Sequence, residues 1–296
     1  MKQWGICSEY NQIHSVVLSC PELDYSKIIN PDDAMHYGSI CCHKLQEEFD
    51  LYTNLLESLN VKVYRTDKEL DFFPDEAYYN MIFSRDLAMV TREGIIISNM
   101  NFKVRKREPE KMLEFLERLH IPILSVIKGE GTFEGADALW VKEDTVLIGI
   151  NSRTNKEGFA QINDILSRIG VKAIPVAVPS GIQHLLGIMN IIAKDRVLLR
   201  FGLADKKLCD ILDSLGYEII PLKETNEIMY KQAMNVVAVR SNEIIMPDDC
   251  PATADLYENY GIHVHKTPIH ELRKGAGGLG CATLILERKE SVHNGF

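Results

Sequence analysis

The 296-residue chain is predicted to adopt an α/β fold in which five similar ββαβ units surround a central axis, as a five-bladed α/β-propeller. Three observations predict this. Five helical patterns each end at a Gly, Asn or His and lead directly into a short strand pattern, and these ends recur at residues 60, 120, 170, 216 and 261. A pair of apolar runs joined by a polar turn follows each of the first four units. The fifth unit has one such run, which the N-terminal run 15–19 can complete, and this pairing would close a ring.

The individual elements follow from apolar spacing. Helices are expected at 43–59, 109–119, 157–169, 205–215 and 252–260. The strands after them are expected at 60–64, 120–124, 170–176, 216–220 and 261–264. Paired apolar strands are expected at 87–90 with 95–97, 138–141 with 146–148, 188–192 with 197–199, and 236–239 with 244–246, and a single strand at 282–286. No linker composition divides the chain, so a single catalytic domain over 1–296 is favoured over two α/β domains divided near residue 155.

Composition narrows the function classes. The chain is 46% hydrophobic and 25% charged, with a net charge of −9, which argues against a nucleic-acid partner. The basic residues at 103–107 are predicted to form a solvated loop. No run of 18 apolar residues and no signal-peptide pattern occurs, so a cytoplasmic protein without a membrane partner is expected. Seven cysteines without a CxxC spacing predict neither a disulfide framework nor a cysteine zinc site, and six of them are expected to be ordinary thiols.

Polar residues precede the innermost strand of each unit. Asp86, Glu134, His184, Asn235 and Cys281 occupy equivalent places in the five units. In a closed ring these positions face one central space, so the five side chains are expected to converge. Each residue taken singly is as well explained by an ordinary core or turn role, since a lone buried cysteine more often acts as a small hydrophobe. The recurrence at equivalent positions favours a joint chemical role.

The residue types suit covalent chemistry on a planar cation. Asp86 and Glu134 would hold a guanidinium or amidinium by paired hydrogen bonds. Cys281 would attack its central carbon as a thiolate, and His184 would transfer protons to the departing amine and from water. A metal site formed by the histidines at 263, 265 and 270 is not favoured, because these residues lack the HExxH spacing. Neither a metal nor an organic cofactor is therefore expected.

An ordered set of short motifs strengthens this interpretation. The motifs are Phe-Ser-Arg-Asp at 83–86, Glu-Gly-Ala-Asp at 134–137, Ser-Arg-Thr-Asn with a later Gly at 152–158, His-Leu at 184–185 and Gly-Gly-x-x-Cys at 277–281. Together they resemble the pentein superfamily of guanidino-modifying enzymes, over residues 13 to 286. That superfamily includes arginine deiminases, dimethylarginine dimethylaminohydrolases and amidinotransferases.

The resemblance implies a role for each matching position. Cys281 would be the nucleophile, His184 the general acid and base, and Glu134 its catalytic partner, and Asp86 would bind the guanidinium with Glu134. Arg153 resembles the arginine that binds a substrate α-carboxylate, with a surface ion pair as the alternative. Further substrate-binding positions are Asn80, Arg85 and Asn235. The loop at 23–35 would lie near the entrance and act as a lid.

The resemblance leaves the branch open. Leu186 replaces the Asp of a His-x-Asp motif and is similar to the dimethylarginine hydrolases, whereas Arg85 is similar to the deiminases. The expected activity is hydrolysis of a guanidino C–N bond in arginine or an N-substituted arginine through a covalent thiouronium on Cys281. The alternatives are an amidinotransferase, an arginine dihydrolase and a catalytically silent relative that binds a cationic ligand. A small cationic guanidino substrate is the expected partner, and a homodimer is a further expectation.

Overall fold

The strands in the described part of the chain form five separate three-stranded sheets. The computed structural model describes residues 4–20, 23–70 and 78–289. The sheets are β3–β4–β5 (Ala88–Val90, Ile95–Ile97, Ile123–Val126), β6–β7–β8 (Ala138–Lys142, Thr145–Ile150, Lys172–Ala177), β9–β10–β11 (Met189–Ala193, Arg196–Arg200, Glu218–Leu222), β12–β13–β14 (Val237–Arg240, Glu243–Pro247, His263–Thr267) and β15–β1–β2 (Leu284–Arg288, Ile13–Leu18, Lys62–Arg65). In every sheet the middle strand is antiparallel to the first strand and parallel to the third. The repeated unit predicted from the sequence is confirmed.

The N-terminal strand completes the last unit. β1 pairs antiparallel with β15, with Val16 opposite Ile285 and Val17 opposite Leu284, and it pairs parallel with β2. The first and last parts of the chain therefore share one sheet, as the missing strand of the fifth unit predicted.

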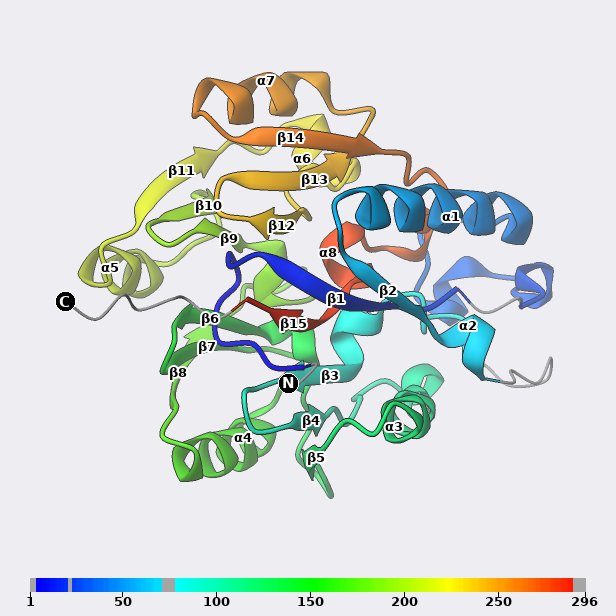
Figure 1. Cartoon of the computed structure of the whole chain (residues 1–296), viewed down its shortest axis with the longest axis horizontal. Coiled ribbons are helices and arrows are strands. Elements are labelled where there is room, and N and C mark those ends of the chain that lie inside the picture. The colour runs from blue at the N-terminus through cyan, green and yellow to red at the C-terminus, as the bar shows by residue number, and fades with distance from the viewer. Residues whose placement is uncertain (1–3, 21–22, 71–77, 290–296) are drawn as a thin grey trace.

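The five longer helices lie on the outer side of the sheets (Figure 1). They are α1 (Cys42–Ser58), α3 (Glu108–Arg118), α4 (Lys156–Arg168), α5 (Lys206–Ser214) and α7 (Pro251–Asn259). Each lies within one or two residues of its predicted bounds. The residues predicted to end them all have positive φ, which is the left-handed conformation that terminates helices: Asn60, His120, Gly170, Gly216 and Gly261. Asn155 and Asp205 cap the starts of α4 and α5 by accepting from backbone N–H groups.

The strands of each sheet differ in how deeply they are buried. Strands β3, β4, β9 and β13 are buried along their whole length, whereas the third strands of the sheets, such as β5 and β8, are partly exposed. The apolar core therefore lies along the first and middle strands, and the outer helices cover the third strands. None of the helices in the described ranges has both the length and the apolar character needed to cross a bilayer.

Short helical turns precede four of the first strands, and the sequence patterns had not indicated them. They are η3 (Ser84–Leu87), η5 (Gly135–Asp137), η6 (Leu185–Gly187) and α8 (Leu279–Ala282). The remaining short elements are α2 (Thr66–Glu69), α6 (Asn226–Tyr230), η1 (Tyr25–Lys27), η2 (Pro31–Ala34), η4 (Lys103–Arg105) and η7 (Leu272–Gly275). Asp86 lies in η3, Cys281 lies in α8, and Glu134 and His184 are the residues that begin η5 and η6. These turns present the polar side chains that the repeat analysis had singled out.

Candidate active site

The glycine-rich segment before Cys281 is required by close packing. A Cβ atom on Gly277 would lie 2.4 Å from the ring of Phe83, and one on Gly280 would lie 2.8 Å from Oδ1 of Asn235. Real Cβ atoms do not approach other atoms this closely, so side chains at these positions would displace the turn. The glycines therefore let α8 pack tightly enough to place Cys281 beside Asn235.

Asn235 holds both the thiol and the backbone of Cys281. Its Nδ2 donates to Sγ of Cys281 at 3.0 Å, and its Oδ1 accepts from the Cys281 backbone N–H at 3.1 Å. Burial and, to a smaller extent, the Asp86 carboxylate raise the pKa of the Cys281 thiol to about 11, against the lowering effect of the Asn235 hydrogen bond. The thiol is thus oriented but protonated at neutral pH.

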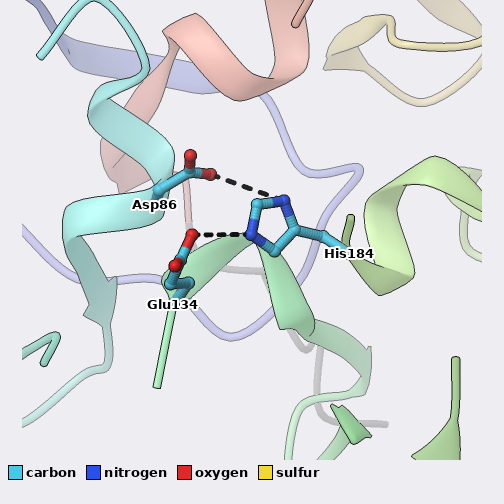
Figure 2. Close-up of side chains that lie close together, drawn as sticks. All are labelled: Asp86, Glu134 and His184. Carbon is cyan, nitrogen blue, oxygen red and sulfur yellow. Dashed lines mark hydrogen bonds and ion pairs between the residues drawn. The ribbon is translucent and has the colours of Figure 1, made fainter. Parts of the chain in front are cut away.

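His184 lies between two carboxylates (Figure 2). Its Nε2 is 2.8 Å from Oε2 of Glu134, and its Nδ1 is 3.9 Å from Oδ1 of Asp86. Burial would lower the pKa of His184, but the Asp86 and Glu134 carboxylates outweigh it and raise that pKa. The protonated form of the imidazole is therefore stabilised, and it can donate a proton.

Glu134 is fully buried and remains ionised. Burial opposes its charge, but the hydrogen bond with His184 and the charges of His184, Arg105 and Arg153 lower its pKa to about 2. Nη1 of Arg153 lies 3.3 Å from Oε1 of Glu134, and its guanidinium stacks 4.5 Å above the Phe102 ring. Arg153 therefore lies in the predicted cluster, where in this state it binds a carboxylate of the protein.

Arg105 is a member of the cluster that the sequence analysis missed. The prediction of a solvated loop at 103–107 is wrong for this residue, because its side chain is only 4% exposed. Nη1 of Arg105 is 2.7 Å from Oδ2 of Asp86, and its Nε is 2.8 Å from Oε2 of Glu108. A signal was present: Arg105 follows Asp86 by the same 19 residues by which Arg153 follows Glu134. The repeat thus places one arginine beside each carboxylate.

Two further buried carboxyl groups surround this network. Burial raises the pKa of Glu108 to about 7 and the pKa of Asp137 to about 7, against the lowering effects of their neighbours. Asp137 accepts from the Leu185 backbone N–H at 2.9 Å and from Oγ1 of Thr154 at 2.6 Å. Asp137 therefore fixes the turn that carries His184 against the turn that carries Glu134.

A cavity of about 260 Å³ opens beside the thiol. His184, Asn235 and Cys281 line its inner end. The outer wall combines apolar and charged side chains, which include Tyr37, Met229, Tyr230, Arg200 and Glu224. Arg200 and Glu224 form an ion pair with each other. The cavity connects the cysteine side of the cluster with the surface.

Of the predicted substrate-binding residues, Asn235 lines this cavity, whereas Asp86, Arg153, Asn80 and Arg85 do not. Arg85 forms a two-pronged ion pair with Glu9, at 3.0 and 3.2 Å, and donates to the Ala138 carbonyl at 3.1 Å. Asn80 is hydrogen-bonded to Nε2 of His36 at 3.1 Å and to the Ala34 carbonyl at 3.0 Å. Asn80 therefore anchors the end of the predicted lid loop, and Arg85 lies behind the cysteine turn.

Asp86, Glu134 and His184 have ligand atoms within 4.8 Å of one another, a spacing that one metal ion could bridge. Both carboxylates are, however, already paired with Arg105 and Arg153. A metal ion would have to displace these arginines, because it needs several free carboxylate oxygens. A guanidinium can use a single free acceptor, and Oδ1 of Asp86 is one among the described residues. The arrangement therefore suits an organic cation better than a metal ion.

Comparison with known proteins places the chain in a family. The family model for arginine deiminase matches residues 67–207 and 202–288. The arginine deiminase of Listeria monocytogenes serovar 1/2a is 25% identical over 265 residues, which are 75% of this chain and 64% of that protein. The N(G),N(G)-dimethylarginine dimethylaminohydrolase of Pseudomonas aeruginosa is 24% identical over 254 residues, 84% of this chain and 91% of that protein.

Solved structures share the fold at lower identity. The Pseudomonas aeruginosa dimethylarginine dimethylaminohydrolase complexed with citrulline superposes with a TM-score of 0.74 at 24% identity, covering 92% of this chain and 99% of that one. The inosamine-phosphate amidinotransferase of Streptomyces griseus superposes with a TM-score of 0.76 at 17% identity, covering 98% of each chain. The protein belongs to the arginine deiminase family, within the pentein superfamily of guanidino-modifying enzymes.

Proposed function

We propose that this protein hydrolyses a guanidino C–N bond of arginine or an N-substituted arginine through a covalent thiouronium on Cys281. The observation that carries the proposal is that one cavity is bounded by a thiol and by an imidazole held between two buried carboxylates. These groups supply a nucleophile, a proton donor and the anions that bind a guanidinium. Membership of the family supports the same reaction class.

Asp86 is the first contact for the substrate cation. Its Oδ2 is bonded to Arg105, whereas its buried Oδ1 has no hydrogen-bond partner among the residues described. A buried acceptor without a donor is costly, and a guanidinium N–H satisfies it. Glu134 is the second acceptor, on the other side of His184.

The reaction begins with formation of the thiolate. The thiol has a high pKa in the free protein, and the charge of the bound guanidinium lowers it, so that the thiol proton passes to solvent through the open cavity. The sulfur then attacks the guanidinium carbon and forms a C–S bond. His184 gives its proton to the departing amine, the C–N bond breaks, and a thiouronium and a free amine result.

Water completes the cycle. Neutral His184 accepts a proton from water as the oxygen attacks the thiouronium carbon and forms a C–O bond. The C–S bond then breaks and returns the thiolate, while the remaining hydroxyl proton passes to solvent and leaves a neutral ureido product. Asn235 donates to the sulfur in both steps, so its proposed role moves from substrate binding to orientation of the nucleophile.

In this proposal the whole chain is one domain, with the five sheets closed around the site. Hydrogen bonds join the successive units: Arg85 to the Ala138 carbonyl, Leu185 N–H to Asp137, Asn190 to the Val236 carbonyl, and Arg288 to the Ala238 carbonyl. Contacts between β15 and β3 join the last unit to the first and support the closure. Arg153 is retained as the candidate for a substrate carboxylate, which requires it to exchange Glu134 for the ligand. The loop at 23–35 precedes Tyr37 on the cavity wall and is retained as the candidate lid.

A substrate panel tests the proposal. The protein is incubated separately with arginine, N-methylated arginines and agmatine, and products are identified by mass spectrometry. A ureido product from one substrate alone supports hydrolysis, and ornithine with two ammonia molecules indicates a dihydrolase. A requirement for an acceptor amine indicates an amidinotransferase. No turnover of any guanidino compound, together with no adduct on Cys281, would contradict the enzymatic proposal.

A further inference from the structure

A second, smaller cavity lies directly behind the turn that carries Cys281. Its volume of about 10 Å³ is enough for about one water molecule. Gly280 and Thr283, on either side of Cys281, form one part of its wall. Leu186 lines both this rear cavity and the open cavity in front. The front and rear cavities are thus separated by Leu186 and the cysteine turn.

Three charged side chains line the rear cavity: Glu9, Arg85 and Arg288. Glu9 and Arg85 neutralise each other through their two-pronged ion pair. Glu9 also accepts from the Trp140 backbone N–H at 3.2 Å, so its oxygens are satisfied. The Glu9 carboxylate is therefore not available to form an ion pair with Arg288.

Arg288 is buried without an acidic partner in the described part of the chain. It is 4% exposed, and its Nη1 donates to the carbonyls of Asn11 and Ala238. Its Nε is buried and has no hydrogen-bond partner among the described residues. Burial lowers the pKa of Arg288 to about 9, with Glu9 opposing that shift and Arg85 adding to it. The rear group of Glu9, Arg85 and Arg288 carries a net charge of +1.

A buried charge of this kind needs a compensating anion. The carboxylates in front of the turn are already occupied, Asp86 by Arg105 and Glu134 by Arg105, Arg153 and His184. Cys281 lies on the turn between those groups and the rear cavity, and it becomes an anion during the proposed reaction. Its thiolate is the negative charge that the rear group lacks.

We propose that Arg288, together with the Glu9–Arg85 pair, stabilises the thiolate of Cys281 from behind, as a positioning group that never touches the substrate. This inference rests on the proposed function, because it assigns the nucleophile to Cys281. It gives Arg85 a role at the site different from the substrate contact expected from the sequence. It also assigns roles to Arg288 and Glu9, which the sequence analysis had not singled out.

The electrostatics around the thiol agree with this assignment. Burial and Asp86 raise the pKa of Cys281, whereas the Asn235 hydrogen bond, the Gly278 backbone and the charge of Arg85 lower it. In front of the thiol, His184, Arg200 and Glu224 line the open cavity and Asp86 lies beside His184, whereas the rear group lies behind the thiol. Because the front charges change when substrate binds, the rear group is the constant part of the field.

The test measures the thiolate without any substrate. The rate at which iodoacetamide alkylates Cys281 is followed between pH 7 and 9.5 by peptide mass spectrometry, with the exposed Cys41 as an internal reference. Arg288→Met removes the unpaired positive charge and is expected to slow alkylation about three- to tenfold at pH 7 to 8, with a smaller effect toward pH 9.5, because the pKa of Arg288 is about 9. Glu9→Gln leaves Arg85 without its carboxylate, which raises the net charge of the rear group, and is expected to accelerate alkylation by a similar factor.

The matched control is Arg196→Met, which removes a more exposed arginine paired with Glu218 on β10–β11 and should leave the rate unchanged. A purely structural role would slow or accelerate both variants together, so shifts of opposite sign support the proposal. Equal rates in all variants, or shifts of the same sign, overturn it. Circular dichroism and melting curves identify any variant that has lost its fold, and Arg288→Lys then serves as the conservative variant, expected to retain the native rate.

A salt comparison excludes a different partner for Arg288. Alkylation is repeated in chloride and in gluconate at equal ionic strength. If chloride slows the native protein and has no effect on Arg288→Met, a small anion compensates Arg288 and the proposal is overturned. Equal rates in both salts support the thiolate. Because no substrate is present, failure of this test is distinguishable from failure of the substrate panel.

Discussion

The carboxylate side of the site and its cysteine side are held in different ways. On the carboxylate side, Asp86 and Glu134 are fixed by Arg105 and Arg153, so the charges are compensated before any ligand arrives. On the cysteine side, the thiol of Cys281 has the Asn235 amide as its donor and borders the open cavity. The carboxylate side is therefore preorganised, whereas the cysteine side gains its charge only when a cation binds.

This difference predicts whether a substitution lowers the stability of the protein, its activity or both. Changes on the carboxylate side remove one member of a buried ionic network and should lower stability as well as activity. Changes on the cysteine side remove neutral groups and should lower activity while the fold persists. The following predictions examine that division.

The largest effect is expected for Cys281→Ser. A hydroxyl is a much weaker nucleophile than a thiolate in this setting, so turnover should fall by at least about a thousandfold. The melting temperature should stay close to that of the native protein. Cys209→Ser, on the partly exposed α5 cysteine, is the control and should retain full activity. Substantial activity in Cys281→Ser would remove the nucleophile from the proposal.

Glu134→Gln should reduce both activity and stability. It leaves Arg153 without its buried carboxylate partner and removes one of the three carboxylates around Arg105, and a loss of about 3–5 kcal/mol in unfolding free energy is expected. Because Glu134 helps raise the pKa of His184, that pKa should be lower in the variant. As the pH is raised, the variant should therefore lose activity at a lower pH than the native protein does. Denaturant unfolding and pH–rate profiles measure the two effects. Glu218→Gln, at a partly exposed ion pair, should change stability by less than about 0.5 kcal/mol.

Asn235→Ala should act mainly on the thiol. Loss of the donor to Sγ raises the pKa of Cys281 further, so turnover should fall about ten- to a hundredfold. Alkylation of Cys281 by iodoacetamide should slow as well, at any pH below that pKa. If stability falls as much as in Glu134→Gln while alkylation is unchanged, the division between the two sides is wrong.

Glu108→Gln should produce the smallest effect, confined to the pH dependence of stability. The pKa of Glu108 is raised to about 7 in the folded protein, so between pH 4.5 and 7 the folded state holds a proton that the unfolded state has lost. That difference makes stability fall as pH rises through this window, and Asp137 contributes in the same direction.

Without the Glu108 carboxyl, the decrease in unfolding free energy from pH 5 to pH 7 should be smaller by about 1–2 kcal/mol. The melting temperature should accordingly decrease less over this range. Calorimetry at several pH values measures it. Asp210→Asn, at an exposed ion pair on α5, should leave the slope unchanged. An identical slope in Glu108→Gln and the native protein would show that Glu108 is ionised in the fold.

Much of the fold follows from local sequence. Apolar spacing located the five outer helices, and the residues that end them adopt the left-handed conformation that their type favours. The unpaired fifth strand identified β1 as the partner of β15. The short turns η3, η5, η6 and α8 escaped notice, because three or four residues cannot show a helical period.

The site was predictable only in part. Equivalent repeat positions singled out Asp86, Glu134, His184, Asn235 and Cys281, and all five lie around one centre in the fold, because a repeated unit places equivalent residues alike. The contacts of Asn235 and the burial of Arg105 could not be inferred from spacing. A basic run at 103–107 has the composition of a solvated loop, and the buried carboxylates that attract one of its arginines lie elsewhere in the chain.

Regular elements and their ends thus depend on neighbours in the chain, so the sequence was sufficient to locate them. The pairing of charges depends on neighbours in space. Glu9 and Arg85 are 76 residues apart and Glu134 and His184 are 50 apart, yet each pair is in direct contact. A guanidinium can bind a substrate, a carboxylate of the protein or neither, and burial with the available partners decides which. In the described ranges, Arg85 is therefore paired with Glu9, whereas Arg288 has no acidic partner behind Cys281.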